Sequence, residues 1–126
     1  MISSERILVV DDDDDIREVM QDVLLSEGFR VDAAKDGLDA LSKLGHDGAP
    51  PLILLDMMMP NMDGEAFLRA LRGHPELADA PVVVISGNAA VREKATSLHA
   101  AACLVKPFEL DELLGVVRRL THDGHH

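Results

Sequence analysis

The sequence predicts an α/β fold in which a single, doubly wound, five-stranded parallel sheet in the order 2-1-3-4-5 is combined with five helices. Three observations predict it. Apolar runs of strand length alternate along the chain with segments of helical periodicity, and this alternation gives parallel strands with helices on both faces of the sheet. The length of 126 residues suits one compact domain. A hydrophobic fraction of 47% is enough for a core between the layers.

Short apolar runs define the expected strands, which span residues 6–10, 30–33, 52–56, 81–86 and 102–105. The first, third and fourth runs are uniformly apolar, as strands covered on both faces must be. The second run alternates between polar and apolar residues and the fifth is short, which suits the two edges of a sheet. This pattern is compatible with the order 2-1-3-4-5.

Apolar residues at helical spacing define the expected helices. Gly28 is placed to end the first helix, Gly45 and Gly48 the second, and Gly73 the third. The five stripes are Ile16, Val19, Met20, Val23 and Leu24; Leu38, Leu41 and Leu44; Phe67, Leu68 and Leu71; Val91, Ala95 and Leu98; and Leu110, Leu113, Leu114 and Val117.

Composition narrows the classes of function. The formal net charge of −11 argues against binding a polyanion through a general basic surface, so we expect no nucleic-acid binding by this domain alone. No signal peptide is visible, and no apolar stretch approaches the ~20 residues of a membrane helix. With the single Cys103, these features favour a cytoplasmic protein. We expect one domain over residues 1–121 and a tail over 122–126 that could come from cloning.

Acidic residues follow two of the buried strands. Asp11 and Asp12 come directly after the first strand, and Asp56 ends the third. The expected strand order places its switch point between these two strands, so the three carboxylates would converge on one crevice. Like charges this close repel unless a cation lies among them, and Mg²⁺ commonly bridges carboxylates to phosphate. The acids therefore predict a Mg²⁺ site, whereas Asp14 and Asp15 are expected to cap the first helix.

A hydroxyl-bearing residue ends the fourth expected strand, and a lysine follows the fifth. Ser86 ends the fourth strand and Lys106 follows the fifth. A carboxylate can be a nucleophile toward phosphorus and form an acyl phosphate, and such chemistry depends on positioning and charge neutralisation. Asp56 would be the nucleophile, with Lys106 and Ser86 binding phosphoryl oxygens. A strand-end carboxylate is by itself more often structural, and the neighbouring residues reverse those odds.

Four strings, ILVVDDD, LILLDMMMPNMDG, VVVISG and CLVKPFELDEL, resemble the receiver domain of two-component response regulators. They occur in that family's order and spacing and cover residues 5–120. The resemblance implies a flavodoxin-like, receiver-like fold and a role in a phosphorelay. The chain would accept a phosphoryl group from a histidine kinase or a phosphotransfer protein and then switch partner binding. It would be a signalling domain and not an enzyme, catalysing at most its own phosphotransfer and autodephosphorylation.

The resemblance also implies residue roles. It implies Mg²⁺ ligation by Asp12, Asp56 and the backbone carbonyl of Met58, with Asp11 acting mainly through water. It implies that the phosphoryl group is held by the phosphoacceptor Asp56, by the switch hydroxyl of Ser86 and by Lys106. It further implies a cis peptide bond between Lys106 and Pro107.

Two departures from the family pattern concern the last strand. The family usually has Tyr or Phe where Cys103 stands, and Gly-Ala where His99-Ala100 stands. In the family that aromatic ring swings inward on phosphorylation, and a cysteine cannot sweep the same volume. We therefore expect the output to run through the surface of the expected fourth helix and the loop before it, residues 87–90, and not through a ring switch.

Three other interpretations stay open. A Mg²⁺-dependent phosphatase or phosphotransferase with an aspartyl nucleophile would want a second acid where Met58 stands. A flavin-binding protein of the same strand order would want aromatic flanks, and the chain has no Trp or Tyr. A receiver-like module that is never phosphorylated would not need the intact acids, Ser86 and Lys106. The downstream partner and formation of a homodimer are not fixed by the sequence.

Overall fold

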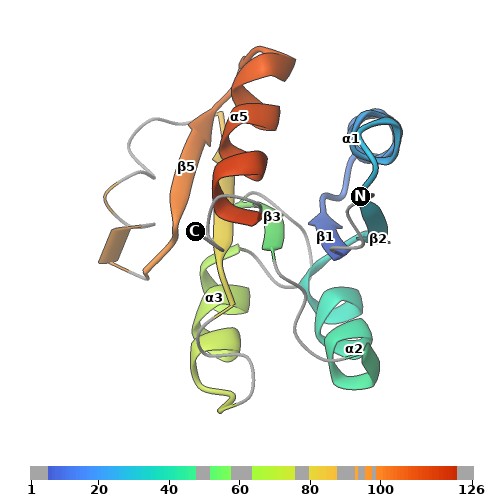
Figure 1. Ribbon diagram of the computed structural model, residues 1–126. Coiled ribbons are helices and arrows are strands. Elements are labelled where there is room, and N and C mark those ends of the chain that lie inside the picture. The colour runs from blue at the N-terminus through green and yellow to red at the C-terminus, as the bar shows by residue number, and fades with distance from the viewer. Residues whose placement is uncertain are drawn as a thin grey trace.

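The computed structural model describes residues 6–47, 52–57, 64–75, 80–87, 93, 96–97 and 99–121. One parallel sheet runs through the molecule in the order β2-β1-β3-β4-β5 (Figure 1). The predicted α/β fold class and strand order are therefore confirmed. The strands are β1 (Arg6–Val10), β2 (Arg30–Ala34), β3 (Leu52–Asp56), β4 (Val82–Ser86) and β5 (Ala102–Val105).

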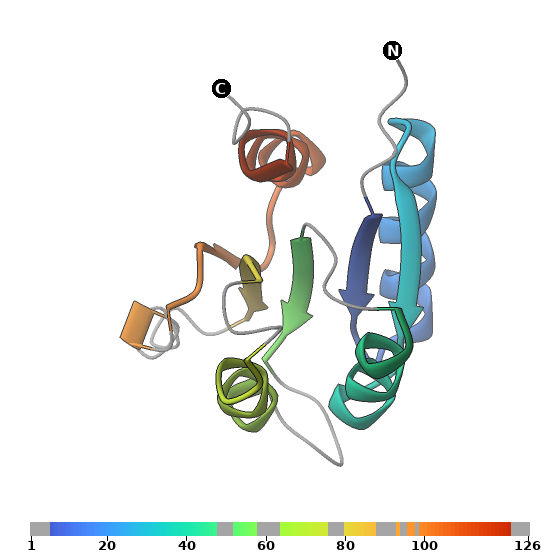
Figure 2. The ribbon, with the colours of Figure 1, turned by 60° about the horizontal axis from the view of Figure 1, so that its bottom comes forward.

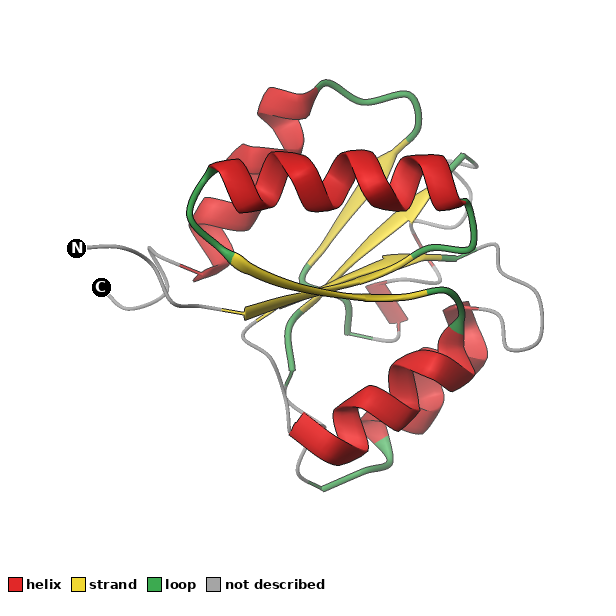
Figure 3. Ribbon diagram, turned by 90° about the vertical axis from the view of Figure 1, so that its right-hand side faces the viewer, coloured by secondary structure: helices red, strands yellow, loops and turns green. Residues whose placement is uncertain are grey.

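Helices cover both faces of the sheet. Those described are α1 (Asp14–Ser26), α2 (Gly37–Asp47), α3 (Gly64–Arg72) and α5 (Leu110–Thr121). In Figure 3 the sheet lies between two helical layers, with α1 and α5 in one layer and α2 and α3 in the other. Figure 2 shows α2 and α3 side by side. The stripe residues of the expected fourth helix, Val91, Ala95 and Leu98, lie outside the described residues.

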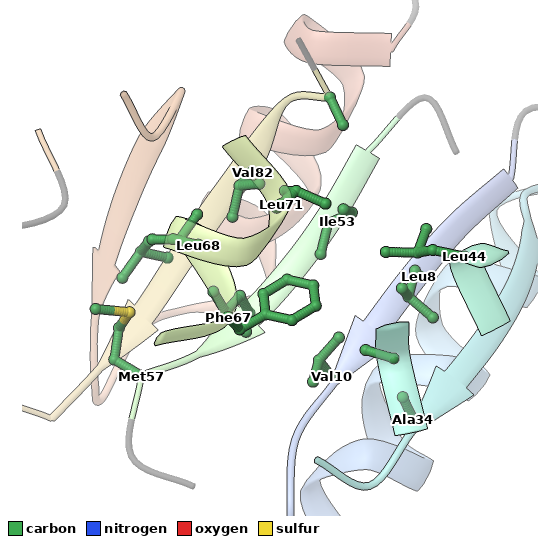
Figure 4. Close-up of a cluster of buried hydrophobic side chains, with 14 residues drawn as sticks. Leu8, Val10, Ala34, Leu44, Ile53, Met57, Phe67, Leu68, Leu71 and Val82 are labelled. Atoms are coloured by element: carbon green, nitrogen blue, oxygen red, sulfur yellow. The ribbon is translucent and has the colours of Figure 1, made fainter. Parts of the chain in front are cut away.

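The sheet divides the core in two because successive side chains of a strand point to opposite faces. On one face, the inward residues of β1 and β3 pack against α2 and α3, where Phe67 and Leu71 lie over Ile53 (Figure 4). On the other face, Ile7 and Val9 pack with the apolar sides of α1 and α5. Every residue of β3 and β4 is buried, which explains why these two strands read as continuous apolar runs.

The helix ends agree with the sequence at some positions and not at others. Gly28 follows α1 with a φ of +93°, a left-handed conformation that favours glycine, and α3 ends one residue before Gly73. Gly45 lies within α2, which ends at Asp47, one residue before Gly48. The tail 122–126 lies outside the described residues, so the domain boundary stays a prediction. Among the helices that the structure describes, none has the length and apolar character needed to span a membrane.

Candidate functional site

The pairing of β1 with β3 brings the strand-end acids together. Val10 is level with Leu55, so Asp11 and Asp56 occupy equivalent positions at the carboxyl edge of the sheet. Carboxylate oxygens from Asp11, Asp12 and Asp56 lie within 4.8 Å of one another. Three oxygen donors this close form a donor set that suits a hard divalent cation.

The backbone hydrogen bonds of the sheet extend one residue past the strand ends and fix this edge. The Asp11 N–H donates to the carbonyl of Ala34 at 3.1 Å, and the Met57 N–H donates to the carbonyl of Ile85 at 3.1 Å. The carboxylates therefore start from backbone positions that the sheet itself holds in place.

Asp11 is held at one of its two carboxylate oxygens. Its side chain is buried, and its Oδ1 accepts a hydrogen bond from the Asp13 N–H at 2.9 Å. Its Oδ2 is buried with no hydrogen-bond partner among the described residues. Leaving a buried carboxylate oxygen unsatisfied is costly, and a cation between the three acids would remove that cost.

Burial raises the pKa of the Asp11 carboxyl above its ordinary value of 3.8. The hydrogen bond from the Asp13 N–H and the positive charge of Lys106 both lower this pKa, but desolvation outweighs them. The carboxylate form of Asp11 is therefore disfavoured, as expected for an acid placed where a cation would compensate its charge.

The other two acids differ in exposure. Asp56 is 5% exposed at the end of β3, whereas Asp12 faces solvent. The cluster therefore has a buried floor, made by Asp11 and Asp56, and an open side at Asp12. Such an arrangement leaves room for the water ligands that Mg²⁺ usually keeps.

The acidic run continues into α1, where Asp13 is the N-cap. Its Oδ1 accepts hydrogen bonds from the N–H groups of Asp15 at 2.9 Å and of Ile16 at 3.2 Å. The expectation that Asp14 and Asp15 cap the helix is thus corrected, because both lie within its first turn. There their charges still complement the helix dipole.

Ser86 and Lys106 lie at the same edge, on the neighbouring strands. Ser86 is fully buried at the end of β4, and its carbonyl accepts a hydrogen bond from the Lys106 N–H at 2.7 Å. The positive charge of Lys106 lowers the pKa of the Asp11 carboxyl, so the two charged groups interact across this edge of the sheet. The peptide bond between Lys106 and Pro107 is cis, as the resemblance implies. Met58, whose carbonyl was expected to bind Mg²⁺, lies outside the described residues.

Two residues at the site received no role from the sequence. Arg17, one turn into α1, donates from Nη1 to the carbonyl of Asp11 at 2.7 Å and also pairs with Asp14. Gly64 begins α3 and donates its N–H to the carbonyl of Met57 at 3.2 Å. In the sequence, the only indication of a role for Arg17 is that a positively charged residue stands six positions after Asp11. No sequence pattern indicates that Gly64 approaches Met57.

Both departures in the last strand are visible in the structure. Cys103 is half-buried and packs against the core on the α2 and α3 face of the sheet. His99 has a φ of +62°, so a side-chain-bearing residue occupies the left-handed region where the family usually has glycine.

Comparison with known proteins agrees with this geometry. The response regulator receiver domain profile matches residues 7–118. Response regulator MprA of Mycobacterium tuberculosis is 42% identical over 119 residues, which cover 93% of this chain and 50% of MprA. The chain therefore spans about half the length of that relative.

Solved structures of the same fold include two response regulators. Chemotaxis protein CheY4 of Vibrio cholerae superposes with a TM-score of 0.86 at 28% identity, covering 94% of this chain and 99% of CheY4. Response regulator TrrA of Thermotoga maritima, solved in complex with Mg(2+)-BeF, gives a TM-score of 0.81 at 34% identity, covering 92% of this chain and 98% of TrrA. The chain belongs to the response regulator receiver domain family.

Proposed function

We propose that this receiver domain accepts a phosphoryl group on Asp56 in a Mg²⁺-dependent reaction and thereby switches the binding of a partner. The observation that carries the proposal is the convergence of three carboxylates within 4.8 Å, with Asp56 buried at the strand end between Asp11 and the β4 strand. A nucleophilic carboxylate beside a cation site is the arrangement that phosphoryl transfer to an acid requires.

The residues present fit Mg²⁺. The donor atoms are carboxylate oxygens, and the buried Oδ2 of Asp11 has no hydrogen-bond partner among the described residues. TrrA, at 34% identity, was solved as a Mg(2+)-BeF complex, which supports the same ion here. When bound, Mg²⁺ would neutralise charge on the phosphoryl oxygens and on the acids around them.

The chain's own residues accept and bind the phosphoryl group. A carboxylate oxygen of Asp56 attacks the phosphorus atom, and the bond from phosphorus to the nitrogen of the donor histidine breaks. The Lys106 ammonium pairs with a phosphoryl oxygen, and the Ser86 hydroxyl donates a hydrogen bond to another. Burial of Asp56 and Ser86 keeps bulk water away from the new acyl phosphate.

The donor in this proposal is a histidine kinase or a histidine phosphotransfer protein in the cytoplasm, and the domain itself is a signalling module and not an enzyme. Its family membership supports this assignment. The alternative of a phosphatase with an aspartyl nucleophile would want a second acid two residues after Asp56, and Met58 stands there instead.

The test compares the parent with Asp56→Asn and with the control Asp13→Asn, which keeps a competent N-cap residue. Each protein is incubated with a phosphohistidine donor and Mg²⁺, and base-labile phosphate is counted. We expect incorporation in the parent and in Asp13→Asn, none in Asp56→Asn, and none in the parent with EDTA. Equal incorporation in Asp56→Asn and the parent would show that the acceptor is another residue.

A further inference from the structure

The start of α3 lies directly against the end of β3. Gly64, the first residue of the helix, is buried and donates its N–H to the carbonyl of Met57 at 3.2 Å. A Cβ atom added at Gly64 would lie 2.6 Å from the Cα of Met57, 2.5 Å from its Sδ and 3.2 Å from the carbonyl oxygen of Asp56. Any side chain at position 64 would therefore press on the strand end that carries Asp56.

Space, and not backbone conformation, requires glycine at this position. Gly28 offers the contrast, because its φ of +93° excludes most side chains although nothing lies within 4 Å of its Cβ position. The backbone of Gly64 lies outside that left-handed region. Real Cβ atoms essentially never come within 3.0 Å of a heavy atom outside their own residue and its chain neighbours. A rotation of the Met57 side chain can move Sδ away, but the Met57 backbone can retreat only if the peptide between Asp56 and Met57 moves.

We infer that Gly64 is a positioning residue for the phosphoacceptor, an inference that rests on the proposed function. By letting α3 approach the strand end, it fixes the Asp56–Met57 backbone at the depth where the Asp56 carboxylate meets those of Asp11 and Asp12. Functional groups of such sites must be held to within about 0.5 Å. A methyl group at position 64 therefore displaces one of three converging ligands and leaves the other two in place.

The test is Gly64→Ala, with Gly115→Ala as the matched control. Gly115 lies on the exposed side of α5, and a Cβ there meets nothing within 4 Å. Mg²⁺ alone is titrated into each protein and followed by amide chemical shifts of residues 9–13 and 54–57. We expect about 10–100-fold weaker Mg²⁺ binding in Gly64→Ala, as for changes that reorient metal ligands, and unchanged binding in Gly115→Ala.

Melting temperatures with Mg²⁺ and with EDTA separate positioning from general stability. If Gly64 serves only the stability of the fold, Gly64→Ala lowers both melting temperatures equally and the increment from Mg²⁺ is retained. We expect the increment itself to shrink. A retained increment with parent-like Mg²⁺ affinity would overturn the inference.

The double variant Met57→Ala/Gly64→Ala separates side-chain crowding from displacement of the backbone. Met57→Ala removes the Sδ atom but leaves the Met57 backbone, which a methyl group at position 64 would still press on. The double variant should therefore bind Mg²⁺ as weakly as Gly64→Ala. Restoration to the affinity of Met57→Ala alone would show that side-chain crowding, and not displacement of the strand end, is the cause, and would reject the inference.

Two remaining outcomes are also decisive. If Gly64→Ala melts below the assay temperature, the titrations are repeated in trimethylamine N-oxide, which favours the folded state. A variant that stays unfolded there marks Gly64 as a residue of general stability and rejects the positioning role. If the parent itself binds no Mg²⁺, the proposed function fails first and the inference fails with it.

Discussion

Arg72 at the end of α3 donates a hydrogen bond from Nη2 to the carbonyl oxygen of His99 at 3.0 Å. Its other terminal nitrogen, Nη1, donates to the carbonyl of Ala80 at 2.8 Å. One guanidinium group thus ties the helix to the entry of β4 and to the turn before β5. Because the planar fork of arginine reaches two carbonyls at once, lysine cannot replace it here.

We predict that Arg72→Ala lowers the free energy of unfolding by about 1–3 kcal/mol, the range for hydrogen bonds from a charged donor. Arg69 provides the control on the same helix, since it is exposed and its partner among the described residues is Glu65, four residues earlier. Arg69→Ala should cost no more than about 0.5 kcal/mol. Urea denaturation followed by circular dichroism measures both, and equal losses would refute the role given to Arg72.

His99→Gly should stabilise the protein. The left-handed conformation costs a residue with a Cβ about 1–2 kcal/mol, and glycine removes this strain. The greater conformational freedom of glycine in the unfolded chain offsets part of that stabilisation. We expect a net increase of about 0.5–1 kcal/mol in the free energy of unfolding. His99→Ala keeps the Cβ and should bring no such gain. A gain from alanine equal to that from glycine would point to the imidazole instead of the backbone.

Asp11 should make the metal-free protein less stable at neutral pH than at low pH. Its folded-state pKa lies above the ordinary value of 3.8, so between those two values the folded state binds more protons than the unfolded state. The free energy of unfolding therefore falls as pH rises through this window, and the loss persists above it.

Asp11→Asn removes that loss and retains an oxygen that can accept the hydrogen bond from Asp13. In EDTA the variant should melt at a higher temperature than the parent at pH 7, and the difference should disappear below pH 3.8. With saturating Mg²⁺ the order should reverse, because only the parent keeps the complete donor set. A constant difference across all pH values would exclude titration of Asp11 as the cause.

Cys103 should contribute little to the conformational change that phosphorylation causes. Its short side chain is half-buried against the α2 and α3 face, and it cannot rearrange as an aromatic ring does. With a beryllofluoride phosphoryl mimic, we expect larger amide shifts at Ser86 and Gly87 than at residues 102–112. Equally large shifts over 102–112 that vanish in Cys103→Ala would identify Cys103 as the switch.

The fold could be predicted from the sequence because its central strands are buried on both faces. Continuous apolar runs such as 52–55 admit few alternatives, and an acid directly after such a run can lie only at the edge of the sheet. The N-cap of α1 could not be predicted in the same way. Five adjacent aspartates have the same capping chemistry, and only the three-dimensional structure shows that Asp13 is the N-cap. Gly45 looked like a helix end, but α2 continues through it to Asp47. The role of Gly64 depends on its closeness to Met57 in space, which no local pattern records.

Val9 and Val10 are bonded neighbours, yet they belong to different cores on opposite sides of the sheet. Truncating both should cost close to the sum of the two single losses, because they share no packing partners across the sheet. The two helical layers can therefore diverge separately in evolution. Side chains behind α1 and α5 can be exchanged without repacking those behind α2 and α3.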